Sequence, residues 1–182
     1  MKKAYIFVAV ILIIIIGVVL ATRKKSTTST SSTKSASSAS SISSAKKVDA
    51  CAVFTLADAQ SVLGVNAKKT EGASANTESS TARVSTCNYN DGSASADEQT
   101  VTILARSSSG NDVAKNAFEA AEPDGAQTIT GYGDAAYYSS SYGQFDVVKN
   151  NVWLIISAGP SVPSQRDVSS AEQVAKIALS RI

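Results

Sequence analysis

The residue types that support common catalytic chemistry are sparse in this sequence. Its 182 residues include no histidine, two cysteines and fifteen acidic residues. Without an imidazole, the chain cannot build a Ser-His-Asp or Cys-His catalytic site, a histidine-ligated metal centre or a histidine pH switch. The composition therefore excludes most common hydrolase mechanisms, and we expect no catalytic residue, no bound cofactor and no metal ligand.

Two patterns still imitate catalytic sites. Asp124, Asp134 and Asp146 are of the type that forms a glycosidase pair, but no spacing marks two of them as facing each other, so we expect them on the solvated surface. Two Ser-x-x-Lys matches, 31–34 and 43–46, imitate the nucleophile motif of penicillin-binding proteins. They lie in a Ser-rich tract that offers no rigid helix to lower the lysine pKa. A carboxylate-based or Ser/Lys-based envelope hydrolase is kept as an alternative function.

The two cysteines, Cys51 and Cys87, suit a disulfide bond. A bond between them would close a loop whose chain entropy corresponds to roughly 4 kcal/mol of stabilisation. Two buried free thiols are the alternative, and a redox role is disfavoured because no Cys-x-x-Cys spacing is present. We predict that the bond forms, because disulfides persist in proteins outside the cytoplasm.

Aromatic residues concentrate in one segment of the chain. This segment contains four of the six tyrosines, a phenylalanine and the only tryptophan: Tyr132, Tyr137, Tyr138, Tyr142, Phe145 and Trp153. Alternate residues of paired strands face the core, which would account for about half of these rings. The others would form an exposed patch for a partner or glycan. Tyr138 and Tyr142 are our candidate partner-binding residues.

The N-terminal residues predict a membrane anchor. Residues 4–21 carry no charge and would span roughly 27 Å as a helix, close to the thickness of a bilayer core. Lysines precede this run, and Arg23, Lys24 and Lys25 end it. A cleaved signal peptide is the alternative, but the apolar run is longer than a signal peptide's apolar core, and the basic cluster disfavours cleavage. We expect residues 1–25 to form a single-pass anchor, with the C-terminal domain extracytoplasmic.

Composition divides the rest of the chain into a linker and one domain. Residues 26–49 are rich in Ser, Thr and Ala and have too little apolar surface to offset the entropy of ordering, so we expect a disordered linker. Residues 50–182 are long enough to form one domain. Eight basic residues lie at or before Lys47, while the remainder carries nine basic and fifteen acidic residues. This acidic balance argues against nucleic acid as a partner.

Hydrophobic periodicity and turn residues predict three helices and five strands in the domain. The expected helices are 56–63, 112–122 and one that Ser169 or Ser170 opens; the expected strands are 84–90, 99–106, 135–139, 144–149 and 152–157. The expected order contains hairpins and no alternating βαβ period. We therefore predict an α+β domain in which helices pack on an antiparallel sheet of about five strands, preceded by one transmembrane helix and the linker.

Several short motifs carry a resemblance to a known kind of domain. They are Cys51 with the segment 54–59, Cys87-Asn88-Tyr89, the segment 131–137 and the segment 148–151. Together they resemble small cell-envelope domains of actinobacterial lipoproteins of unknown function, some of which are similar to the PsbP-like α/β sandwich. The resemblance implies an exported domain with a disulfide between the matching cysteines. No lipobox cysteine is present, so the apolar N-terminal segment would replace lipid anchoring.

These observations favour a non-enzymatic, membrane-anchored domain outside the cytoplasm that binds a protein, lipid or cell-wall component. A structural spacer or assembly piece is a second alternative to the hydrolase.

Overall fold

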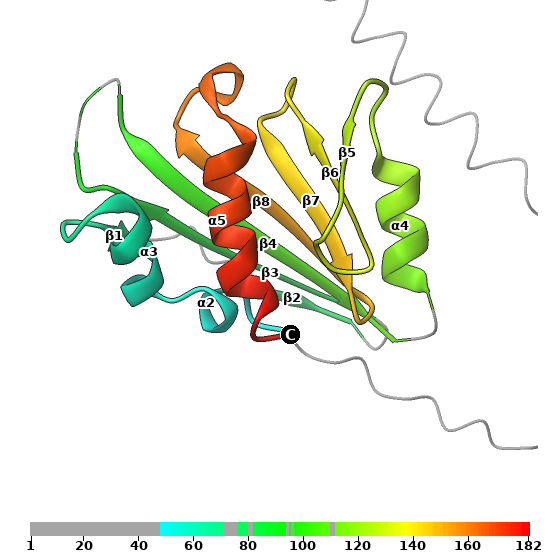
Figure 1. The fold of residues 1–182 in the computed structure, drawn as a ribbon. Coiled ribbons are helices and arrows are strands. Elements are labelled where there is room, and N and C mark those ends of the chain that lie inside the picture. The colour runs from blue at the N-terminus through cyan, green and yellow to red at the C-terminus, as the bar shows by residue number, and fades with distance from the viewer. Residues whose placement is uncertain (1–47, 71–75, 80–81, 94, 96, 110–111) are drawn as a thin grey trace, which may run out of the picture. The chain divides into compact units, whose positions relative to one another are not determined.

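The computed structural model of the protein describes residues 48–70, 76–79, 82–93, 95, 97–109 and 112–182. In this part of the chain, eight strands form one sheet with the order β1-β3-β4-β8-β7-β6-β5, and β2 also pairs with β3 (Figure 1). Every pairing is antiparallel. The strands are β1 (Lys68–Lys69), β2 (Asn76–Glu78), β3 (Ala82–Asn90), β4 (Gln99–Ser108), β5 (Gln127–Ile129), β6 (Ala135–Ser139), β7 (Gln144–Lys149) and β8 (Val152–Pro160).

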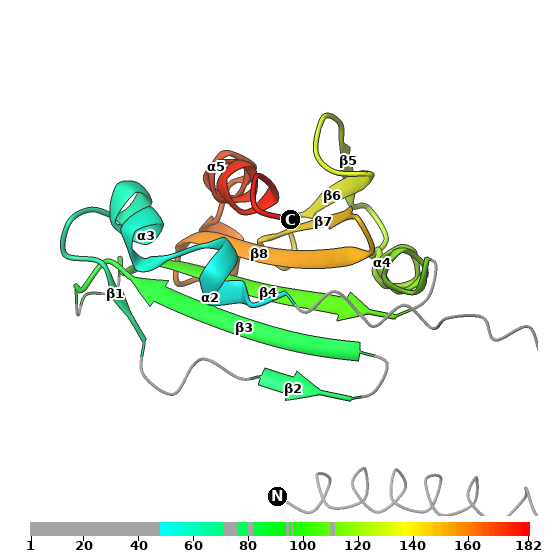
Figure 2. The same ribbon diagram turned by 90° about the horizontal axis from the view of Figure 1, so that it is seen from below.

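Four α-helices and one short 3-10 helix accompany the sheet in the described ranges. They are α2 (Ala50–Val53), α3 (Leu56–Leu63), α4 (Val113–Ala121), α5 (Val168–Leu179) and the 3-10 helix η1 (Pro163–Gln165). Figure 2 shows α2, α3 and α5 on one side of the sheet, while α4 lies apart from them at the other end. The sheet therefore has one face covered by three helices.

The predicted fold class is wrong. The domain is mostly β, with eight strands instead of about five. The missed strands β1, β2 and β5 are only two or three residues long and mostly exposed, so they carry no apolar alternation. The predicted transmembrane helix lies outside the described residues, as does the linker up to Lys47. Among the described helices, none is long and apolar enough to cross a bilayer.

The main core lies between the sheet and helices α2, α3 and α5. Strand alternation supplies it with Val101 and Ile103 from β4, Phe145 from β7, and Leu154 from β8, all fully buried. Helix α5 adds Val174, which is also fully buried. The central strands β4, β8 and β7 therefore have the hydrophobic pattern from which strands were predicted.

A second, smaller core lies on the opposite face of the same strands, under α4. It consists of Ala114, Phe118, Tyr137, Val148 and Trp153. Each of its strand residues alternates with a residue of the main core, so the strands near α4 are buried on both faces. This double burial explains why so many aromatic residues occur between Tyr132 and Trp153.

The predicted disulfide between Cys51 and Cys87 is confirmed, with a Cα–Cα distance of 5.2 Å. It fastens α2 to the middle of β3. Two hydrogen bonds reinforce this junction: the Ala50 amide donates to the Ser85 hydroxyl at 3.0 Å, and the Tyr89 hydroxyl donates to the Phe54 carbonyl at 2.7 Å. The N-terminal helices are therefore held to the sheet by covalent and polar contacts.

Two turn residues, Asn150 and Asn151, position the elements nearest to the aromatic segment. Asn150 and Asn151 both have positive φ angles, 50° and 60°, which is the geometry of the tight turn that joins two twisted strands. The Asn151 side chain accepts from the Ala114 amide at 3.0 Å and donates to the Ser108 carbonyl at 2.9 Å. One turn residue thus links the β7–β8 hairpin, α4 and β4.

The predicted helix boundaries need two corrections. Helix α3 has the predicted bounds, and Thr55 and Asp58 form a capping box at its start. Helix α5, however, begins at Val168, because the Asp167 side chain caps it by accepting from the Ser170 amide at 2.9 Å. Helix α4 begins after Asp112, whose side chain makes no capping bond.

Candidate functional site

The described residues form a small pocket where the β6–β7 hairpin meets the end of α4. We define this hairpin-tip pocket by Tyr137, Ser139, Tyr142, Asp146 and Trp153. Its volume is about 150 Å³, and Ala121 and Pro123 complete the wall on the α4 side. Three aromatic rings, three hydroxyl groups (those of Tyr137, Ser139 and Tyr142) and one carboxyl group therefore share a hollow large enough for a small chemical group.

Sheet register brings these side chains together. Tyr137 lies opposite Asp146 in the β6–β7 pair, and Asp146 lies opposite Ile155 in the β7–β8 pair. Trp153 precedes Ile155 by two residues, so its side chain is on the same face. All four side chains therefore point to the face that carries α4.

Asp146 is the unusual member of the site. Only 4% of its surface is exposed, and its Oδ1 accepts from the Trp153 indole nitrogen at 2.8 Å. Burial raises the pKa of its carboxyl to about 6, although hydrogen bonds from Trp153 and Tyr137 oppose this rise. In the described ranges no Lys or Arg forms an ion pair with it. Asp146 is thus a buried carboxylate that is ionised at neutral pH without a cationic partner.

Aromatic contacts fix the wall of the pocket. Phe118 of α4 lies 4.8 Å from the Tyr137 ring and 6.2 Å from the Trp153 ring, centroid to centroid. The Arg106 guanidinium lies 5.6 Å from the centre of the Trp153 ring. Burial, with the nearby charges of Asp146 and Glu122, raises the pKa of Tyr137 above its usual value, so its phenol stays protonated at neutral pH. Tyr137 is therefore a hydrogen-bond donor within the pocket.

The two candidate partner-binding tyrosines have different environments. Tyr142 is 57% exposed and lines the hairpin-tip pocket. Tyr138 is only 6% exposed, and its hydroxyl donates to the Arg166 carbonyl at 2.9 Å within the main core. The expectation that both form an exposed patch is therefore wrong for Tyr138, because it packs in the main core and its hydroxyl is bound to Arg166.

Sequence reasoning placed Asp146 on the solvated surface, and this expectation is wrong. The signal that would have identified it is its position in the run Phe145-Asp146-Val147-Val148, where it is flanked by apolar residues of both faces. The other two acids considered as a glycosidase pair with it are exposed. In the described part of the chain, no group of three or more Cys or acidic side chains could hold a metal ion.

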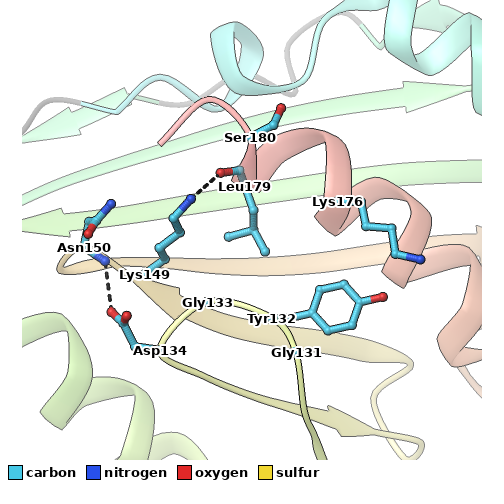
Figure 3. Close-up of a pocket in the computed structure, with 9 residues that line it drawn as sticks. All are labelled: Gly131, Tyr132, Gly133, Asp134, Lys149, Asn150, Lys176, Leu179 and Ser180. Atoms are coloured by element: carbon cyan, nitrogen blue, oxygen red, sulfur yellow. Dashed lines mark hydrogen bonds between the residues drawn. The ribbon is translucent and has the colours of Figure 1, made fainter.

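A second hollow, the α5-end groove, lies between α5 and the loop that precedes β6. Its volume is about 520 Å³, and Figure 3 shows Tyr132, Lys149 and Lys176 around it. The Lys149 ammonium donates to the Leu179 carbonyl at 2.7 Å, and the Lys176 ammonium lies 5.9 Å from the centre of the Tyr132 ring. Both lysines thus already have partners: one caps the C-terminus of α5, and the other packs on a tyrosine.

The loop beside this groove has a structural explanation as well. Gly131 and Gly133 both have positive φ angles, and a Cβ at Gly133 would collide with the Val148 carbonyl. The Asp134 amide donates to that same carbonyl at 2.7 Å. The Asp134 carboxylate accepts from the Asn150 amide at 3.0 Å (Figure 3). The glycines therefore allow a tight entry into β6.

Comparisons with known proteins add no relative. No family model matches the chain, and no curated protein or solved structure matches it either. The functional argument for this protein therefore depends on its own sequence and geometry.

Proposed function

We propose that this protein is a non-enzymatic binding protein of the cell envelope. Its N-terminal apolar segment attaches it to the membrane, its C-terminal domain lies outside the cytoplasm, and that domain binds an envelope component at the hairpin-tip pocket. The observation that carries the proposal is the buried carboxylate of Asp146 within an aromatic pocket whose rim residue, Tyr142, is exposed.

The disulfide supports the location. Thiols are kept reduced in most cytoplasms, whereas disulfides persist in exported proteins. The bond joins Cys51 and Cys87 across a sequence separation of 36, and closing this loop stabilises the fold. That stabilisation is present only in a compartment where the cysteines stay oxidised. The apolar run 4–21 with its basic flanks supplies a route to the membrane.

The free-energy cost of burying the Asp146 carboxylate supports binding at the pocket. A carboxylate that loses its water without gaining a cation reduces the stability of the fold. Such a group is common at functional sites, where a ligand can supply the missing positive charge. The neighbouring rings add apolar surface of the kind that is enriched at binding sites.

The lining of the pocket favours binding over hydrolysis. A glycosidase of the usual type needs two carboxyl groups that flank the scissile bond, and Asp146 is the only one among the described residues that line the pocket. Ser139 also lines it, but no lysine lies among those residues to activate the hydroxyl. The proposal therefore includes no chemical step.

Site-specific photo-crosslinking in intact cells tests the proposal. A photoreactive phenylalanine analogue is placed at position 142 of the full chain, or at position 65 as a control, since Val65 is 84% exposed and lies near the β1 end of the sheet. We expect a discrete crosslinked product from position 142 that Asp146→Asn weakens. Equal products from both positions, or none from position 142, would show that the pocket is not the binding site.

A further inference from the structure

We infer that the hairpin-tip pocket binds an organic ammonium group, of the size of a methylated ammonium. This inference depends on the proposed function, because it names the ligand class for the same pocket. It follows from three properties of the described residues: the charge of Asp146, the aromatic walls and the size of the hollow.

The charge around the pocket favours a cation. Only 4% of the surface of Asp146 is exposed, and this residue has no ion-pair partner among the described residues. Glu122, at the end of α4, is close enough to act electrostatically on the Tyr137 hydroxyl. From Val48 onward, the chain has nine basic and fifteen acidic residues. A cation is therefore attracted both by the domain as a whole and by the carboxylate in the pocket.

The walls favour an ammonium over a metal ion. Tyr137, Tyr142 and Trp153 supply aromatic rings, and the faces of such rings attract organic cations. The Arg106 guanidinium already lies over the Trp153 ring, so Tyr137 and Tyr142 are the lining rings left for a ligand cation. A hard metal ion would need several oxygen ligands, and no suitable cluster occurs in the described ranges.

The size of the hollow limits the bound group. Its volume of about 150 Å³ equals that of an engineered protein cavity that accepts one benzene molecule. A trimethylammonium group has a similar bulk, whereas a complete sugar ring with its hydroxyl groups or a lipid chain needs more space. The rest of the ligand would extend past Tyr142 into solvent.

The α5-end groove offers no equivalent site for an anion. Lys149 and Lys176 are held by a helix carbonyl and by the Tyr132 ring. The C-terminal end of a helix also carries a partial negative charge, which disfavours anions there. Cation binding at the hairpin tip is thus the stronger inference.

Calorimetric titration with matched probes tests the inference. The full chain is kept in maltoside micelles, which contain no ammonium group, and is titrated with choline and with 3,3-dimethylbutan-1-ol, its neutral analogue of the same shape. We expect saturable binding of choline at one site and at least about ten-fold weaker binding of the alcohol, since the analogue lacks the charge that Asp146 and the rings recognise.

Two variants and one control assign the binding to the pocket. Asp146→Asn removes the charge with little change in shape, and we expect it to weaken choline binding at least about ten-fold. Tyr142→Ser changes an exposed rim residue, so it tests the pocket without disturbing the core, and we expect several-fold weaker binding. Asp97→Asn removes one exposed charge in the β3–β4 connection, whose residues do not line the pocket, and should leave the affinity unchanged.

The outcomes separate this inference from the proposed function. Equal binding of choline and the alcohol would overturn the ammonium assignment and leave the pocket as a site for neutral groups. No binding of choline, together with a retained crosslink from position 142, would overturn the ligand class but not the site. Choline binding that Asp146→Asn and Tyr142→Ser both leave unchanged would overturn the assignment to this pocket. A choline-binding chain can then be offered phosphatidylcholine or phosphatidylglycerol vesicles, and selective binding to the former would identify a lipid headgroup as the source.

Discussion

Replacement of Asp146 by asparagine should stabilise the protein at neutral pH. Burial raises the pKa of this carboxyl from 3.8 to about 6. A shift of this size corresponds to about 3 kcal/mol of differential free energy between the two protonation states. At pH 7.5 the native carboxylate is ionised and desolvated, so the fold carries that unfavourable free energy. Asparagine removes the charge and keeps an oxygen that can accept from the Trp153 indole.

The sign of the pH dependence follows from the same shift. Because the native carboxyl holds its proton more tightly than the unfolded carboxyl, the native state binds more protons between pH 3.8 and about 6. The free energy of unfolding of the wild-type protein should therefore rise relative to that of Asp146→Asn as the pH falls from 7.5 to 4.5. Asp58 acts in the opposite direction, since a hydrogen bond from Arg181 holds its pKa far below the usual range. It does so in both proteins, so their difference isolates Asp146.

Urea unfolding followed by fluorescence of Trp153, the only tryptophan in the chain, measures this difference. At pH 7.5 we expect Asp146→Asn to be more stable by about 2–3 kcal/mol, and near pH 4.5 we expect this advantage to fall to about 1 kcal/mol. Asp124→Asn should match the wild type at both values. A variant that is less stable at pH 7.5, or a difference that does not change with pH, would refute the argument that Asp146 is a desolvated carboxylate.

Four further variants test the fold around the site. Replacing Cys51 and Cys87 by serine should lower the free energy of unfolding by about 4 kcal/mol, measured in urea, and reductant should then have no further effect; an unchanged midpoint would contradict this. Tyr138→Phe should lower the free energy of unfolding by about 1 kcal/mol, because the hydrogen bond to Arg166 is lost. Tyr142→Ser should change it by no more than about 0.5 kcal/mol, because this side chain is exposed. If thermal unfolding shows the larger loss for Tyr142→Ser, the two environments are misassigned. Gly133→Ala should cost more than about 1 kcal/mol, and a neutral effect in the same assay would contradict the close approach of this loop to β7.

The sequence predicts the central strands well because they bury apolar side chains in alternation. Strands β6 and β7 have the predicted bounds, Ala135–Ser139 and Gln144–Lys149. The edge strands β1 and β2 were missed because they are exposed and polar and depend on pairing with β3. Such strands form through backbone hydrogen bonds to a neighbour, which a local hydrophobic pattern does not contain.

The candidate site was only partly predictable. Strand alternation correctly requires Tyr137 and Tyr138 to face opposite sides of the sheet, but it does not show that both sides are covered. The position of α4 decides that Tyr137 is buried, and this position depends on long-range contacts through Asn151. The burial of Asp146 follows from the same docking of α4: its apolar neighbours in the sequence indicate a buried strand, but only the position of α4 shows that the face with Asp146 is covered.

The indole N–H signal of Trp153 tests the central claim most directly. The chain has a single tryptophan, and its indole nitrogen donates to Asp146 within the hairpin-tip pocket. A ¹H–¹⁵N spectrum of the labelled full chain in maltoside micelles therefore contains one indole signal that reports on the site. We predict that choline shifts this signal saturably at pH 7.5 and that Asp146→Asn abolishes the shift. An indole signal that does not move while backbone signals elsewhere in the domain do would contradict binding at the pocket.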